Sequence, residues 1–136
     1  KKYVPLLRLE LVTLIADESG ELVAFGVALP SLSRAMQKAR GRMFPLGACH
    51  LLRALNSNKA EVCDLMLIAA HPTAQNLGAA ALLFTEMIPQ FQKLGTVYAE
   101  SNPELIDNYR IQALWGNFDK VLHKRRAVFA KEIDRK

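Results

Sequence analysis

The chain has 136 residues, 51% of them hydrophobic and 23% charged, and its net charge is +5. This size fits one domain with its own core, and the composition argues against a disordered chain. No apolar run approaches the ~20 residues of a membrane span, and the first residues do not form a signal peptide. No zinc-finger spacing, RNP-type motif or interleaved aromatic residues accompany the charge, so nucleic-acid binding is not favoured.

The first 30 residues predict a β-hairpin. Leu9 to Ala16 and Leu22 to Leu29 are rich in strand-forming residues, and the turn Asp17 to Gly20 separates them. Two apolar runs joined in this way pair naturally as antiparallel strands. Pro30 is expected to end the second strand.

Two helices are expected next. Ser31 or Ser33 provides a cap for a helix that runs to about Arg40, and a second helix fits Leu46 to Leu55 after a break at glycine and proline. Because both helices carry large apolar residues, we expect them to pack onto the sheet. These residues are Leu32, Met36, Leu51, Leu52 and Leu55.

A strand and a long helix follow. Val62 to Ala69 is apolar at nearly every position, which predicts a strand buried on both faces. Leu77 to Leu94 has the spacing of an amphipathic helix that Gly95 ends, with a kink or break expected near Ile88 because Pro89 follows it. Its expected buried stripe is Leu82, Leu83, Met87 and Phe91.

The last part predicts a strand, a helix and a strand. Thr96 to Glu100 reads as a short strand, and Pro103 is placed to open a helix that runs to about Asn117. Arg126 to Ile133 is expected to form the final strand.

The turn between the buried strand and the long helix carries the pattern Q-x-x-G-x-A, from Gln75 to Ala80. Small residues at such a junction leave backbone N–H groups available for a phosphate, here from Asn76, Leu77, Gly78, Ala79 and Ala80. The spacing differs from that of a Walker loop and from that of a Rossmann turn.

This turn resembles the pyrophosphate loop of the GNAT superfamily, the CoA-dependent N-acyltransferases, whose signature is [R/Q]-x-x-G-x-[G/A]. The order of elements over residues 9–133 is also similar to that family, and the segments "LPSLSRAMQKARGRMFPLG" and "HKRRAVFAKEI" resemble an uncharacterised bacterial subgroup. The resemblance implies an α/β fold with a mixed central sheet flanked by helices. The chain lacks a counterpart of the family's opening strand and two helices. The resemblance therefore also implies that the chain is the C-terminal part of a longer protein.

The resemblance further implies an acetyl-CoA or other acyl-CoA co-substrate. Its pyrophosphate is expected at the turn that Gln75 opens, and its pantetheine arm along the end of the preceding strand, at Ile68, Ala69 and Ala70. Asn108 and Trp115 occupy places comparable to cofactor-binding positions of the family. The acceptor is expected to be a primary amine on a small molecule or a peptide.

Acyl transfer to an amine needs a group that removes the amine proton. Glu100 is the first candidate because it ends the strand beside the cofactor strand, and Asp64 and Glu61 come next. Alternatively, Glu100 caps the following helix or binds Asn102, and Asp64 is a hydrogen-bonding residue at a strand edge. Trp115 stands where the family often has a tyrosine, and an indole cannot protonate a thiolate, so Tyr109, another side chain or water takes that role.

Other side chains give no competing site. Cys49 and Cys63 lack metal-binding spacing and are read as two buried thiols in a reducing compartment, which favours the cytoplasm. His71, His50 and His123 lack metal-ligand spacing, so no metal is expected. No membrane partner is expected, and a homodimer is kept open.

Three hypotheses remain. The first is a CoA-dependent N-acetyltransferase. The second is a module of the same fold that binds acyl-CoA or a protein without turnover. The third is an unrelated α/β domain in which the Q-x-x-G-x-A turn occurs by chance.

Overall fold

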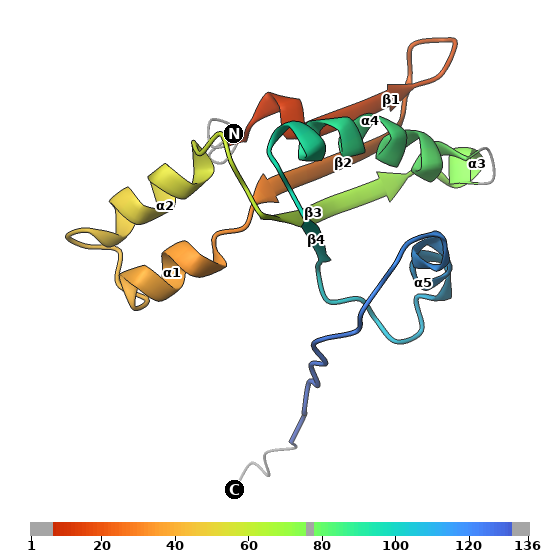
Figure 1. Cartoon of the computed structure of the whole chain (residues 1–136). Helices are drawn as coiled ribbons and strands as arrows, with labels where there is room; N and C mark the ends of the chain where they lie inside the picture. The colour runs from red at the N-terminus through yellow and green to blue at the C-terminus, as the bar shows by residue number, and fades with distance from the viewer. Residues whose placement is uncertain (1–6, 76–77, 132–136) are drawn as a thin grey trace, which may run out of the picture. The chain divides into compact units, whose positions relative to one another are not determined.

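The computed structural model describes residues 7–75 and 78–131, and Figure 1 shows the chain. The chain divides into two compact units, residues 1–102 and residues 103–136. The first unit holds a four-stranded sheet with its helices, and the second holds one short helix and an extended segment. Each unit is described by itself below, and the expectation of a single domain stays a prediction.

The sheet has the strand order β1-β2-β3-β4 (Figure 1). The strands are Val12–Ala16 (β1), Leu22–Pro30 (β2), Val62–Ala70 (β3) and Tyr98–Ser101 (β4). The β1–β2 and β2–β3 pairs are antiparallel, whereas β3 and β4 are parallel. The predicted hairpin is therefore confirmed, and the sheet is mixed.

The predicted first strand begins three residues late. Leu9–Leu11 forms a turn of 3-10 helix, η2, in which the Leu11 N–H donates to the Arg8 carbonyl. Leu11 is only 1% exposed, so the 3-10 turn places its side chain in the core. Strand propensity is a local property and does not predict this turn.

The hairpin turn is held by the Asp17 carboxylate. It accepts hydrogen bonds from the Ser19 hydroxyl, the Ser19 N–H and the Glu21 N–H. The Ser19 hydroxyl is the largest cause that holds the pKa of Asp17 below its usual range, followed by the Glu21 N–H. The predicted turn is thus confirmed, with an Asx-type network as its local cause.

Helices α1 (Ser33–Ala39) and α2 (Gly47–Leu55) follow β2 and precede β3 in the chain, and they lie side by side beyond the end of the sheet (Figure 1). The expected serine cap is wrong, because Leu32 is the N-cap residue and makes no side-chain cap hydrogen bond. The helices pack mainly against each other, and only α2 makes a modest contact with β2. Met36 and Leu52 are accordingly exposed, which corrects the expectation that both helices cover the sheet.

Helix α4 (Ala79–Lys93) covers one face of the sheet (Figure 1). Three residues of the predicted stripe, Leu83, Met87 and Phe91, are buried, whereas Leu82 is 46% exposed. The helix passes through Pro89 without a break, so a break near Ile88 is wrong, whereas a kink there stays a prediction. Packing onto the sheet offsets the backbone hydrogen bond that proline removes.

Small residues on β2 let α4 approach closely. Ala24, Gly26 and Ala28 alternate on the face that α4 covers, and the two alanines are at most 2% exposed. A Cβ atom added to Gly26 would lie 2.8 Å from the Met87 sulfur. Because these β2 side chains are small or absent, α4 packs directly on the strand, with Met87 against Gly26.

Some residues of strand β3 are buried, whereas others are exposed to solvent. Cys63 and Leu65 are buried, but Met66 and Leu67 are 40% and 58% exposed. The prediction of burial on both faces fails because, among the described residues of this unit, no helix covers the second face of β3. The Cys63 thiol donates to or accepts from the Thr96 hydroxyl at 3.3 Å, and burial raises its pKa. The expectation of two buried thiols is confirmed for Cys63 and wrong for Cys49, which is exposed.

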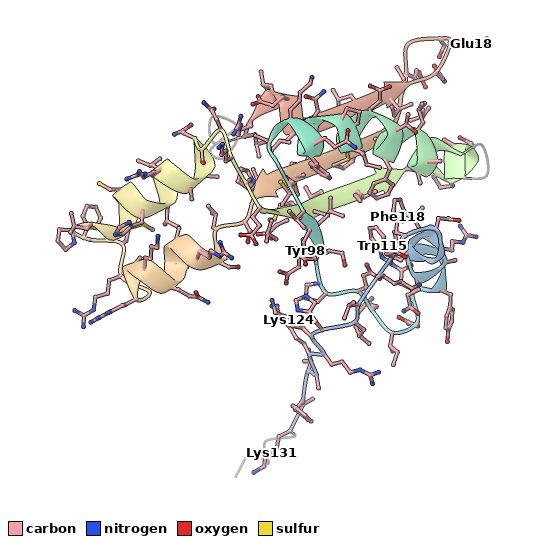
Figure 2. The ribbon with its side chains drawn as sticks, in the orientation of Figure 1. Glu18, Tyr98, Trp115, Phe118, Lys124 and Lys131 are labelled. Atoms are coloured by element: carbon pink, nitrogen blue, oxygen red, sulfur yellow. The ribbon has the colours of Figure 1, made fainter. Side chains whose placement is uncertain are left out.

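The second unit departs most from the sequence-based expectations. The helix expected from Pro103 begins only at Tyr109, as α5 (Tyr109–Leu114), and a 3-10 turn, η3 (Trp115–Asn117), follows it. Asn108 supplies the cap, because its side-chain oxygen accepts from the Ile111 N–H at 3.5 Å. Trp115 and Phe118 stack at a tilt with ring centroids 6.1 Å apart (Figure 2).

The predicted final strand is wrong within the described residues 126–131. These residues have no regular secondary structure, and Val128 and Phe129 are 100% and 91% exposed. Apolar and β-branched residues favour an extended chain, but a strand also needs a partner for its backbone groups. The remaining residues of this prediction, 132 and 133, lie outside the described part of the chain.

Candidate functional site

The junction between β3 and α4 is the first part of the candidate site. After Ala70, the His71 N–H donates to the Val23 carbonyl at 2.7 Å and the His71 Nδ1 pairs with the Thr73 hydroxyl at 2.8 Å. A single helical turn, α3 (Pro72–Gln75), carries the chain from the strand toward α4. Gln75 ends this turn, and the predicted binding residues Asn76 and Leu77 lie outside the described residues.

Gly78 stands immediately before α4. Its φ of +77° lies in the left-handed region, and a Cβ atom placed on it would meet nothing within 4 Å. The Leu82 N–H donates to the Gly78 carbonyl at 3.0 Å, so the helix begins here, and Ala79 and Ala80 form its first turn. An N-terminus of a 15-residue helix preceded by an exposed glycine is suited to an anion.

The edge of β3 that faces β4 is the second part of the site. The parallel ladder runs only from Val62, which pairs with Tyr98, to Leu65, which pairs with Ser101. β3 continues for five more residues, to Ala70, and the last four of them pair with β2. Of the predicted arm-binding residues, Ile68 and Ala70 contact the core under α4, and Ala69 is exposed.

A bulge lies where the two strands part. On β2, Ala28 pairs with Leu65 and Val27 pairs with Leu67, so Met66 is the extra residue of β3. The Met66 carbonyl accepts from the Asn102 side-chain amide at 2.7 Å. The sequence analysis missed this role of Asn102, because nothing in the local sequence marks the bulge.

The two candidate acids lie side by side. Asp64 on β3 and Glu100 on β4 are register partners of the parallel ladder, and both are half-buried. Register partners project from the same face of a sheet, which here is the face opposite the buried Cys63. Asp64 stands about 13 Å from Ile68 along the strand, at about 3.3 Å per residue.

Three predicted site residues belong to the second unit and are described within it. Tyr109 is the first residue of α5 and is 73% exposed. Asn108 is engaged as the cap of that helix, and the Trp115 indole N–H donates to the Glu104 carboxylate. Their roles toward a cofactor stay predictions.

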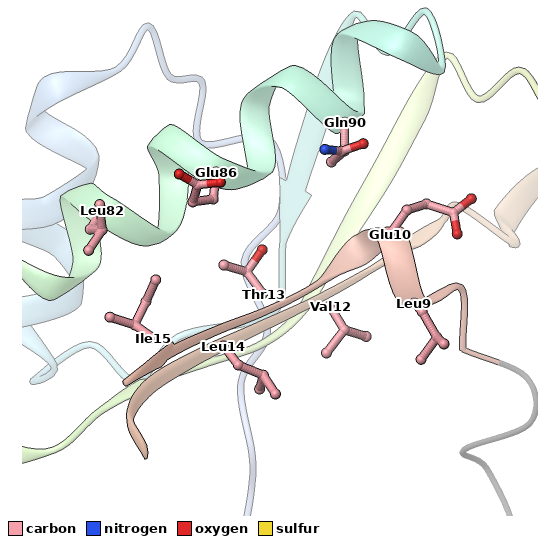
Figure 3. A pocket seen from close by; sticks show the side chains of 9 residues that line it. All are labelled: Leu9, Glu10, Val12, Thr13, Leu14, Ile15, Leu82, Glu86 and Gln90. Carbon is pink, nitrogen blue, oxygen red and sulfur yellow. The ribbon is translucent and has the colours of Figure 1, made fainter. Parts of the chain in front are cut away.

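A shallow cavity of about 440 Å3 lies in the first unit. It is bounded by β1, from Val12 to Ile15, and by Leu82, Glu86 and Gln90 of α4 (Figure 3). Thr13 and Ile15 point toward α4 in this view, whereas Leu14 points to the other face of the sheet. None of the residues predicted for the site lines this cavity. The volume of a cavity therefore does not identify the candidate site in this structure.

No group of three or more His, Cys, Asp or Glu side chains in the described part of the chain is arranged to hold a metal ion. Within residues 7–75 and 78–131, no helix has the length and apolar character that crossing a membrane demands.

The comparison with known proteins supports the fold. No protein-family model matches the sequence, and no curated protein matches it. Among solved structures, the chain is similar to a ribosomal-protein-alanine N-acetyltransferase from Brucella melitensis biovar Abortus 2308. The TM-score is 0.53 at 12% identity, over 88% of this chain and 70% of that chain. The expected α/β fold is thereby confirmed: the chain shares the mixed sheet and flanking helices of this N-acetyltransferase, at an identity that establishes fold and not activity.

Proposed function

We propose that the protein is a CoA-dependent N-acyltransferase that moves an acetyl or other short acyl group to a primary amine. One observation supports this proposal above all. Within the described residues, the ladder between β3 and β4 ends at Leu65, and β3 leads within a few residues to the N-terminus of α4. An extended ligand with amide groups and a diphosphate fits these two features together.

The diphosphate would lie at the start of α4. The backbone N–H groups from Asn76 to Ala80 would donate to it, and the exposed Gly78 leaves room for its approach. No Lys or Arg occurs between Lys59 and Lys93 in the sequence, so the helix dipole and backbone groups supply most of the local attraction.

The arm of the co-substrate would follow the β4-facing edge of β3 from Ala70 toward Met66. Backbone groups of Ile68, Ala69 and Ala70 would pair with its amides, as in the addition of a strand to a sheet edge. A backbone N–H on the same edge would stabilise negative charge on the thioester oxygen during attack. Bound acyl-CoA supplies the activated carbonyl carbon on which the amine acts.

The acids would act at the other end of this edge. An arm that runs toward Met66 brings the acyl group near the register pair of Asp64 and Glu100. We assign Glu100 the removal of a proton from the ammonium form of the acceptor, and Asp64 a supporting role beside it. The departing thiolate takes its proton from Tyr109 or from water, because the Trp115 indole is not acidic.

A second candidate function is a module that binds acyl-CoA without turnover. The absence of basic residues around the turn and the presence of Trp115 favour it. Calorimetry with CoA and acetyl-CoA, combined with a thiol-release assay over a panel of amines, separates the two. Binding with release of CoA supports the transferase, binding without release supports the module, and no binding contradicts both.

We expect Gly78→Asp to weaken CoA binding at least about tenfold, through charge repulsion with the diphosphate at close range. Calorimetry measures the affinity, and circular dichroism checks the fold. The matched control is Gly41→Asp, since Gly41 has a similar φ of +71° and equally open surroundings but lies between α1 and α2. Equal affinities of the two variants would show that the α4 N-terminus is not the diphosphate site.

A further inference from the structure

The helical hairpin between β2 and β3 exposes most of its large apolar side chains. In residues 33–55, all of which the structure describes, only Ala35, Gly47 and Leu55 are buried. The loop between α1 and α2 carries the most exposed of the apolar side chains, with Phe44 at 81% and Leu46 at 65%. The exposed set is Met36, Met43, Phe44, Leu46 and Leu52. Apolar residues that gather in one loop, rather than being scattered singly, indicate a surface that binds another molecule.

The same hairpin concentrates positive charge. The sequence has no Asp or Glu from residue 22 to residue 60, a stretch that holds Arg34, Lys38, Arg40, Arg42, Arg53 and Lys59. Arg34 pairs with the Glu61 carboxylate at 2.8 Å. Within the described residues, no carboxylate forms an ion pair with the other basic side chains of the hairpin, which are all exposed: Lys38, Arg40, Arg42 and Arg53. The hairpin is therefore a cationic surface that also exposes apolar groups.

Charged and apolar groups lie close together at the loop. Arg42 and Leu46 are four positions apart, so their Cα atoms are separated by at most about 14 Å. A strand of RNA would pair with the arginines but would leave Met43 and Leu46 in water. An anionic membrane surface accommodates both kinds of group. Arginines pair with lipid phosphates, while neighbouring apolar side chains enter the boundary between headgroups and acyl chains.

We propose that the α1–α2 hairpin docks the protein on an anionic lipid surface, with Phe44 and Leu46 inserted and Arg40 and Arg42 at the lipid phosphates. The expectation of no membrane partner considered apolar runs long enough to cross a bilayer, whereas a segment that lies on the surface needs only one apolar face. α1 and α2 lie beyond the end of the sheet where β3 begins, whereas α3 and the start of α4 lie where β3 ends (Figure 1). The docking surface is thus separate from the proposed diphosphate site, and this inference does not rest on the proposed function.

Co-sedimentation of the full chain with vesicles tests the proposal. We expect binding to vesicles of phosphatidylcholine and phosphatidylglycerol in equal amounts, and much weaker binding to phosphatidylcholine alone. Arg40→Gln combined with Arg42→Gln should weaken binding to the anionic vesicles at least about tenfold. Phe44→Ser combined with Leu46→Ser should weaken it by about as much, because the inserted apolar area is lost.

Two matched double substitutions show whether the effect belongs to the hairpin. Arg125→Gln combined with Arg126→Gln removes the same charge from exposed residues of the second unit. Leu105→Ser combined with Ile106→Ser removes two exposed apolar side chains from that unit. Both controls should bind anionic vesicles as the wild type does. Because all the replaced side chains are exposed, circular dichroism should show that every variant is folded.

A Phe44→Trp variant reports insertion directly. After subtraction of the wild-type spectrum, its emission should shift to shorter wavelength when anionic vesicles are added, because the indole leaves water. The same vesicles without phosphatidylglycerol should produce a smaller shift. An emission spectrum that anionic vesicles leave unchanged would contradict the insertion of the loop.

Several outcomes would overturn the proposal. One is a wild-type chain that does not bind anionic vesicles, and another is hairpin variants that bind them as tightly as the wild type. Self-association without vesicle binding, lost in the variant with Phe44→Ser and Leu46→Ser, would assign the hairpin to a contact between two copies. Binding of a single-stranded RNA oligomer in place of vesicles, lost only in the arginine variant, would assign it to nucleic acid. CoA binding is measured separately, so none of these results decides the proposed function.

Discussion

We expect Leu83→Ala to lower the free energy of unfolding by about 3 kcal/mol, the middle of the range for a buried leucine. Leu83 is 0% exposed and packs with Ala24 of β2, Ala74 of α3 and Ala79 at the start of α4. The other fully buried members of this cluster are alanines, whose short side chains cannot move to fill the space, and Ile15, Val23 and Ile68 pack at its margin. The substitution therefore leaves a cavity as well as losing buried apolar surface.

Urea denaturation followed by circular dichroism measures this change. The control is Leu82→Ala on the preceding residue, which is 46% exposed and should cost less than about 1 kcal/mol. Equal losses in the two variants would contradict the orientation of α4 on the sheet. Because Ala74 and Ala79 flank the turn between β3 and α4, we also expect Leu83→Ala to weaken CoA binding.

The largest effect on activity is expected from Glu100→Gln, which should lower kcat about 100-fold near neutral pH. The amide has the shape of the carboxylate but cannot take a proton from the acceptor amine. Acyl-CoA affinity should stay nearly constant, since the proposed cradle for the diphosphate consists of backbone groups at the far end of β3. The loss should shrink as pH rises, because more of the amine is then already neutral.

Steady-state kinetics over a range of pH, with a thiol-release readout, measures this effect. Glu86→Gln is the control, because Glu86 is an exposed carboxylate of α4 that borders the cavity beside β1. Asp64→Asn should reduce kcat less than Glu100→Gln does. A Glu100→Gln enzyme with unchanged kcat would assign proton removal to another group or to water.

Several elements follow directly from local patterns in the sequence. The hairpin of β1 and β2, the nine-residue β3 and the buried stripe of α4 all depend on side-chain periodicity over short stretches. Two of the predictions that failed show how tertiary information was missing. Residues 126–131 have strand-like composition without a partner strand, and Pro89 was expected to interrupt a helix that packing keeps continuous.

The candidate site also combines features that the local sequence predicts with features that only the fold creates. The Q-x-x-G-x-A turn and its place between a strand and a helix are local, so the sequence by itself determined the region around Gly78. Only the tertiary structure placed Asp64 beside Glu100, made Met66 a bulge and ended the parallel ladder at Ser101. These features depend on strand register, which is set by contacts between distant residues such as Asn102 and Met66, 36 positions apart.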